Sequence, residues 1–147
     1  MAETLGMLCD KLTIVKLKQY HTEEEQKSAS LNNQAIQLQE EIDEYVSNAV
    51  NGNIPLAKLT FASNKVFKKE GNEVAEAKGN MGALFSQLAA VNCELWHEVE
   101  KGYDIENVPV EEKDKIVKRL AVLNLERNNC IDAIDQTFVD LIKNDNK

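Results

Sequence analysis

The sequence predicts an all-α protein, a helical bundle with long antiparallel helices and a short extra helix in the middle. Apolar residues recur every three or four positions along most of the chain, which is the spacing of one helix face. Pro55, Pro109 and several glycine-containing stretches divide this pattern into segments. No run of alternating apolar and polar residues indicates a strand. At 147 residues the chain suits a single domain over 1–147, with an inserted segment at about 51–82.

The first two helices are predicted from the apolar positions in the first third of the chain. The first helix runs from about residue 3 into the twenties, and one side of it carries Leu5, Leu8, Leu12 and Val15. Thr22 and Glu25 match a capping box, so the helix either restarts there or continues without a break, and both remain open. The next helix ends at the stretch NGNIP and carries a heptad-like seam of Leu31, Ala35, Leu38, Ile42, Tyr45 and Ala49.

The rest of the chain contains one short and two long predicted helices. Pro55 suits the first turn of the short helix, whose apolar positions are Leu56, Leu59, Val66 and Phe67. Gly79 and Gly82 weaken the next segment, so we expect a kink or a break there before a strong helix over about 83–103. Pro109 opens the final helix, which runs to about residue 143 with no internal glycine or proline.

The composition restricts the compartment and the partners. A net charge of -8 with dispersed Lys and Arg argues against a nucleic-acid partner, because that affinity comes from clustered cations. Cys9, Cys93 and Cys130 are odd in number and widely spaced, which indicates neither a disulfide framework nor a thiolate zinc site. The sequence shows neither a secretory pattern nor a membrane-spanning apolar run. We therefore expect a cytoplasmic protein with no membrane partner, of a bacterium or of a virus-infected cell.

Polar residues interrupt the apolar stripes of three predicted helices. Asp10 falls on a stripe with Met7, Ile14 and Leu17. On the penultimate helix, Asn92 interrupts an apolar stripe of Phe85, Leu88, Trp96, Val99 and Tyr103. On the last helix, with Arg127 at the edge, the stripe consists of Val117, Leu120, Asn124, Asn128, Ile131, Asp135, Phe138 and Ile142. An unpaired buried polar group costs about 1–3 kcal/mol. We therefore expect the polar residues of the three helices to meet at one location.

This predicted cluster has two interpretations. In the first, a network of Asp, Lys, Asn and Arg side chains fixes the register of the helices without any ligand. In the second, a pocket binds a small anion. There Lys11, Lys18 and Arg127 neutralise phosphate, Asn92 and Asn124 read polar edges, and Trp96 stacks on a ring. The candidate ligand residues are Asp10, Lys11, Thr13, Lys18, Asn92, Trp96, Asn124, Arg127 and Asn128. We predict no catalytic residue, metal ligand or cofactor.

Three short motifs make the chain similar to a helical family. The first is DKLTI at 10–14 with Lys18 downstream, the second is VNCELW at 91–96 with Glu100 downstream, and the third is NLER at 124–127. Together they resemble a bacterial and phage helical family of unknown function, whose genes are often found near glycosyltransferases. The resemblance implies no catalytic assignment, but its signature residues coincide with those selected by helical geometry. The chain departs from the family pattern at about 51–82 and at His97 and Glu98.

Three functions follow as hypotheses. The favoured one is non-catalytic binding of a small anionic ligand, a nucleotide or a sugar nucleotide, with sequestration as one use. The alternative is an interaction or oligomerisation module, in which the seam from Leu31 to Ala49 pairs with another protein or a second copy, and a homo-oligomer is expected. The third is a magnesium-dependent nucleotide hydrolase, suggested by the carboxylate pairs Glu41 with Glu44, Glu73 with Glu76, and Asp132 with Asp135. These pairs also suit solvated helix faces.

Overall fold

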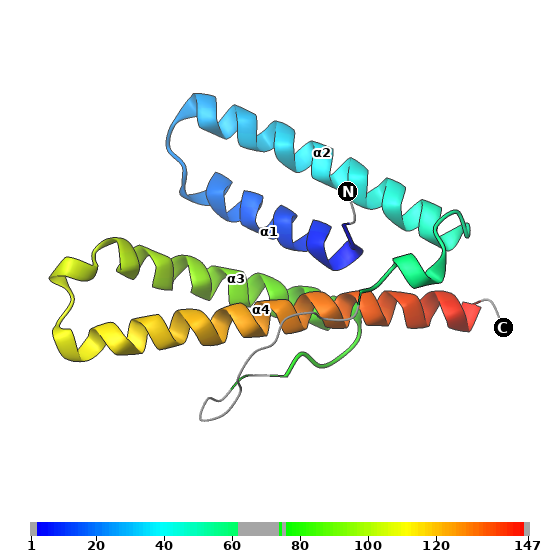
Figure 1. The fold of residues 1–147 in the computed structure, drawn as a ribbon. Coiled ribbons are helices and arrows are strands. Elements are labelled where there is room, and N and C mark those ends of the chain that lie inside the picture. Colours follow the sequence, from blue (N-terminus) through cyan, green and yellow to red (C-terminus); the bar gives the residue numbers. More distant parts are fainter. Residues whose placement is uncertain (1–2, 62–73, 75, 146–147) are drawn as a thin grey trace.

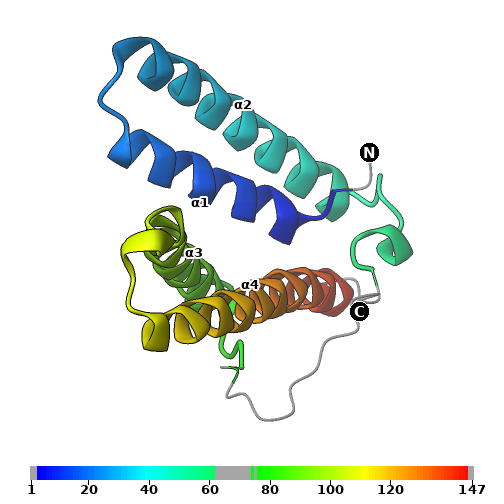
Figure 2. The same cartoon turned by 60° about the vertical axis from the view of Figure 1, so that its left-hand side comes forward.

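The computed structural model of the chain describes residues 3–61, 74 and 76–145, and this part is all-α (Figure 1). Its helices are α1 (Leu5–His21), α2 (Glu25–Val50), α3 (Met81–Tyr103) and α4 (Val110–Asp145). They form two antiparallel hairpins, α1 with α2 and α3 with α4, and α1 lies between α2 and the other pair (Figure 1 and Figure 2). The predicted helical bundle is therefore confirmed. Within the described residues, no helix combines the length and the apolarity needed to cross a membrane.

The ends of α1 and α2 follow from local sequence. Thr4 is the N-cap of α1, and its hydroxyl accepts a hydrogen bond from the Met7 N–H at 3.3 Å. α1 ends at His21 and α2 begins at Glu25, so the helix is interrupted at the boundary that the sequence left open. The N-cap of α2 is Glu24, and its side chain makes no capping hydrogen bond. The capping box that starts at Thr22 is therefore not used.

The segment between α2 and α3 differs from the short helix predicted there. Among its described residues, Leu56–Lys58 form a 3-10 turn that begins after Pro55, and the fully buried Leu59 ends it. Val66 and Phe67, which the apolar pattern places in the same helix, lie outside the described residues. Gly79 has a φ of +113°, a left-handed conformation that favours glycine, and α3 begins two residues later. The predicted break therefore falls at Gly79.

The main hydrophobic core lies where the N-terminal parts of α1 and α3 meet the C-terminal parts of α2 and α4. Its buried members are Leu5, Cys9, Ala49, Leu59, Leu84, Leu88, Cys130, Ile131, Ile134, Phe138, Val139 and Ile142. Ile42 and Tyr45 pack against this cluster, and the rings of Tyr45 and Phe138 lie 6.2 Å apart. The C-terminal half of the seam, with Ile42, Tyr45 and Ala49, therefore packs within its own chain against this core.

The buried face of α3 is shifted from the predicted stripe. The buried positions are Leu84, Leu88, Asn92 and Leu95. Phe85, Val99 and Tyr103 are exposed, and the exposed fraction reaches 87% at Tyr103. The end of the α3–α4 hairpin near Tyr103 extends past the α1–α2 hairpin in Figure 1, so apolar residues there have a single neighbouring helix. The predicted stripe was therefore wrong at these positions.

The first half of α4 shows a similar shift. Its buried face passes through Ile116 and Leu123, whereas Val117 and Asn124 of the predicted stripe are exposed. The second half agrees with the prediction, since Asp135 and Phe138 are buried. α4 contacts both α3 and α1, so its two halves face different neighbours and the buried face changes along this 36-residue helix.

Candidate functional site

Three helices contribute to a buried polar network around Asp10 of α1. The Arg127 Nε of α4 donates to Asp10 Oδ1 at 2.8 Å, and a second guanidinium nitrogen donates to Oδ2. Asn92 Nδ2 of α3 donates to Asp10 Oδ1 at 2.9 Å and to Thr13 Oγ1 at 2.7 Å. The Thr13 hydroxyl in turn donates to the Asp10 carbonyl oxygen at 2.7 Å. We call Asp10, Thr13, Asn92 and Arg127 the Asp10 network.

The polar groups of the Asp10 network form hydrogen bonds with one another. The Asp10 side chain is 6% exposed, yet both of its oxygens accept hydrogen bonds. The hydrogen bonds with Asp10 raise the pKa of the Arg127 guanidinium, against the opposing effect of its burial. A buried carboxylate with a bidentate guanidinium partner and an amide donor does not require a ligand to be stable. We therefore interpret the network as a link that holds α1, α3 and α4 together.

A second buried carboxylate, Asp135 of α4, lies against the first turn of α1. Its Oδ1 accepts from the Gly6 N–H at 2.7 Å, and the Thr4 side chain also hydrogen-bonds to it. Gly6 is required there, since a Cβ would lie 2.6 Å from the Ile131 carbonyl oxygen. The pKa of Asp135 is raised from 3.8 to about 6, mainly by burial and to a smaller extent by the charge of Asp132, against the lowering effect of the hydrogen bonds from Thr4 and Gly6. This end of α1 therefore holds a carboxyl that titrates near neutral pH.

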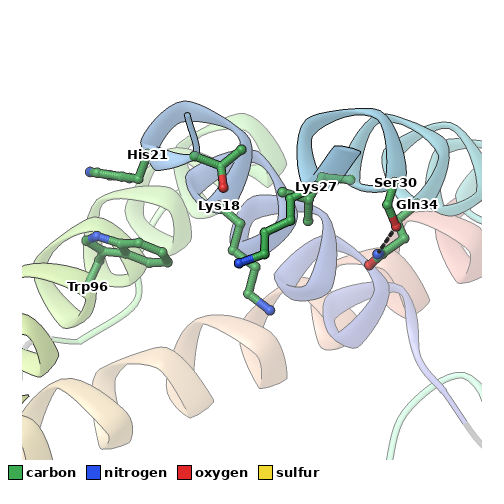
Figure 3. A pocket seen from close by; sticks show the side chains of 8 residues that line it. Lys18, His21, Lys27, Ser30, Gln34 and Trp96 are labelled. Carbon is green, nitrogen blue, oxygen red and sulfur yellow. Dashed lines mark hydrogen bonds between the residues drawn. The ribbon is translucent and has the colours of Figure 1, made fainter. Parts of the chain in front are cut away.

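An open pocket of about 320 Å³ lies beside the turn from α1 to α2 (Figure 3). It is lined by Lys18, His21, Thr22, Lys27, Ser30, Leu31, Gln34 and Trp96. Lys18 reaches it from α1, Lys27 from α2 and Trp96 from α3. None of these lining residues carries a carboxylate, although the chain has 25 acidic residues against 17 Lys and Arg. We call this the turn pocket.

The two lysines of the turn pocket differ in their pairing. Lys18 has no hydrogen-bond or ion-pair partner within the part of the chain that the structure describes. Lys27 Nζ lies 3.4 Å from a carboxylate oxygen of Glu24, and both of those side chains are about two-thirds exposed. An exposed pair of this kind contributes little, because water screens it and both side chains lose freedom. Both ammonium groups are therefore available to an anion.

Aromatic side chains form the other wall of the turn pocket. The rings of His21 and Trp96 are stacked, with centroids 4.6 Å apart and an angle of 20° between the ring planes (Figure 3). Trp96 Nε1 donates to Glu100 Oε1 at 2.7 Å, and His21 Nδ1 lies 2.8 Å from the Leu17 carbonyl oxygen. Because these bonds orient both rings, this wall of the pocket is an indole with an imidazole stacked on it, next to two cations.

The structure divides the predicted ligand residues between these two places. Asp10, Asn92 and Arg127 meet, as the interrupted stripes predicted, and Thr13 joins them. Lys18 and Trp96 instead line the turn pocket. The prediction of one shared location is therefore wrong for this second group. Arg127 also directs two of its nitrogens at Asp10, which leaves the phosphate role predicted for it without support.

Three other predicted ligand residues do not line the turn pocket. Lys11 pairs with Glu3, and its side chain is 51% exposed. Asn124 is exposed on α4, while Asn128 is half-buried. Lys11 and Lys18 lie seven positions apart, and only Lys18 reaches the turn pocket because the pocket lies at the end of α1.

Sequence reasoning missed several residues of the turn pocket, above all Lys27, Ser30 and Gln34. They lie in the first turns of α2, which folds back against α1 after the break at 22–24. Recognition of that break was the available signal, because a reversal there brings the start of α2 next to Lys18. The sequence left the break open, so this neighbourhood was not predicted.

The residues considered for metal and thiol chemistry are scattered. Glu41 and Glu44 are exposed on α2, and Glu73 lies outside the described residues. Among the described residues, no group of three His, Cys, Asp or Glu side chains is placed to hold a metal ion. Burial is the main cause that raises the pKa of the Cys9 thiol to about 11, and it also raises that of Cys130. Both therefore behave as core residues.

No protein-family model, curated protein or solved structure matches this chain. The resemblance to a helical family of unknown function therefore stays a prediction from three motifs. Fold and site together define an all-α protein with an internally paired polar network and, apart from it, an open cationic pocket with an aromatic wall.

Proposed function

We propose that the protein binds a small anionic ligand, of the class of nucleotides and sugar nucleotides, in the turn pocket. The observation that carries this proposal is the charge of the lining. Lys18 and Lys27 supply two cations, and no carboxylate lines the pocket, in a chain whose net charge is -8. The exposed Glu24 pairs with Lys27 but does not line the pocket, so the lining itself is positively charged, which favours a phosphate group.

The remaining lining residues suit such a ligand. Ser30 and Gln34 offer hydroxyl and amide groups, and the Gln34 amide already lies 3.4 Å from the Ser30 hydroxyl. The indole of Trp96 is able to stack on a planar ring, as it does on the imidazole of His21 in the structure. The pocket is open, so its charges remain hydrated, and we expect dissociation constants in the range of about 1 μM to 1 mM.

We assign no reaction to the pocket. Its lining includes one imidazole and one hydroxyl group each from Thr22 and Ser30, and no described contact activates a hydroxyl by joining it to His21. Binding alone is sufficient for a role in sequestration of the ligand. The polar network around Asp10 then has a supporting role, because it holds α3, and with it Trp96, against α1.

Native mass spectrometry of the purified full chain first identifies any molecule already bound. The test is then a calorimetric titration of the protein with ATP and with UDP-glucose. We expect binding of at least one compound, and a loss of about tenfold in affinity for Lys18→Gln, since one charge-assisted contact contributes roughly that much. Lys16→Gln is the matched control, because Lys16 is exposed on the same helix and does not line the pocket.

Two outcomes would overturn the proposal. One is absence of binding of both compounds at 1 mM, on the order of the weakest affinity expected for such a site. The other is an equal loss for Lys18→Gln and Lys16→Gln, which would mean that binding follows net charge and has no fixed site. The same mass spectra report the assembly state, for which a homo-oligomer stays our prediction.

A further inference from the structure

The stack of His21 on Trp96 places a planar heteroaromatic ring on the indole inside the turn pocket. The ring centroids are 4.6 Å apart and the planes are inclined by 20°. Figure 3 shows the imidazole over the indole, with the side chains of Lys18 and Lys27 reaching toward the space beside it. A planar ring and cationic groups that would hold an anion are therefore already next to one another in the structure.

The two rings are held with unequal firmness. Trp96 lies in the middle of α3, is half-buried, and is oriented by its bond to Glu100. His21 is the last residue of α1, is exposed, and has one hydrogen-bond contact, with the Leu17 carbonyl oxygen of its own preceding turn. Its other ring neighbours, Tyr20 and His97, meet it edge-on and are exposed themselves. An aromatic pair contributes only about a two- to tenfold factor to an equilibrium constant. Another planar ring can therefore replace the imidazole of His21 on the indole of Trp96.

We infer, on the basis of the proposed function, that His21 occupies the place of the ligand's own ring. The ligand is then a nucleotide whose base stacks on Trp96 after His21 rotates away, while its phosphate lies between Lys18 and Lys27. A sugar phosphate without a base has the anionic group and lacks the ring. Because the base and the imidazole of His21 would occupy the same place on Trp96, His21 competes with the ligand and lowers its affinity for the pocket.

Fluorescence can follow this competition directly, because Trp96 is the single tryptophan of the chain. We would titrate the full-length protein with AMP, GMP, CMP and UMP, with ribose 5-phosphate and with inorganic phosphate. Wild type is compared with His21→Ala and with His97→Ala as the matched control. His97 is the other histidine, is exposed, and its ring centroid lies 6.5 Å from that of His21.

We expect the best nucleotide to bind about tenfold more tightly than ribose 5-phosphate in the wild type, since only the nucleotide stacks. His21→Ala should strengthen nucleotide binding about three- to tenfold, because the competing ring is gone, and should leave ribose 5-phosphate within about twofold. His97→Ala removes an edge contact of His21 but keeps its stack on Trp96, so it should leave both affinities within about twofold. Thermal unfolding of each variant shows whether the chain is folded under the titration conditions.

Three results would overturn the inference. The first is equal affinities for nucleotides and ribose 5-phosphate, both lowered by Lys18→Gln. This would mean that the base does not stack on Trp96, although the anion site binds phosphate. Weaker nucleotide binding by His21→Ala than by His97→Ala would make His21 a contact of the ligand instead of its competitor. Absence of binding of every compound would overturn the proposed function itself, and the inference with it.

Discussion

The two ends of α1 handle polar groups in opposite ways. Near its start, Asp10 and the backbone N–H of Gly6 are buried and each has a partner on α4. At its end, Lys18 has no partner among the described residues and His21 is exposed. The difference teaches that misplaced polar residues on one helix need not share one role. Paired polar groups in the interior fix how the helices pack, whereas unpaired groups at an open pocket are available to a ligand, which is the role that we propose for them.

The largest effect on stability is expected from Arg127→Leu, which removes the guanidinium that pairs with Asp10 of α1. Asp10 would keep Asn92 and lose its guanidinium, so a buried carboxylate would remain without a counter-charge. We expect the free energy of unfolding to fall by about 3 kcal/mol at pH 7. Urea unfolding followed by circular dichroism measures this loss.

Arg119→Leu is the matched control for this substitution. Arg119 is on the same helix and pairs with Glu94, but the side chains of both are about half exposed, so we expect a loss below about 1 kcal/mol. Similar losses for the two variants would contradict our distinction between buried and exposed pairs. A further variant, Asp10→Leu with Arg127→Leu, should be more stable than Arg127→Leu alone, because it removes the unpaired charge as well.

The sequence predicted the fold and the paired network because both depend on helical periodicity. The long helices follow from repeated apolar positions, and Asp10 and Asn92 stand out because each lies where an apolar residue was expected. Burial of these groups requires partners, so their meeting with Arg127 follows from the sequence pattern. The pattern does not contain the geometry of the bonds, because that depends on how the three helices pack.

The turn pocket could not be predicted in the same way, because no periodic pattern records it. Its residues come from the end of α1, the start of α2 and the middle of α3, and most are ordinary surface residues in their own helices. Lys11 and Lys18 are equivalent by spacing, yet tertiary structure pairs one with Glu3 and leaves the other at the pocket. The position of the break between α1 and α2 decides this, and local propensity left it undecided.

A smaller effect is expected from the pH dependence of stability, which probes Asp135 at the closed end of α1. Its pKa is raised from 3.8 in the unfolded chain to about 6 in the folded one, so the folded state binds the proton more tightly. The resulting stabilisation is complete below about pH 4 and is lost as the pH rises through about 6. Between pH 7 and pH 5 this carboxyl should add about 1 kcal/mol to stability.

Asp135→Asn isolates this contribution, because the amide oxygen can still accept from the Gly6 N–H and does not titrate. The difference in free energy of unfolding between wild type and variant should therefore change between pH 5 and pH 7. Chemical unfolding of both proteins at a series of pH values measures it. A difference that stays constant over this range would show that Asp135 does not titrate there.

The smallest effect on stability is expected from Lys18→Gln with Lys27→Gln, at the open end of α1. Lys18 has no partner among the described residues and Lys27 has an exposed one, so the free energy of unfolding should change by less than about 0.5 kcal/mol. Urea unfolding measures this, with Arg127→Leu as the reference for a structural cation. A loss above about 1 kcal/mol would give the lysines a structural role. Unchanged stability with weakened binding would assign them to the ligand, because a cation that contributes nothing to folding and much to affinity acts only when an anion is present.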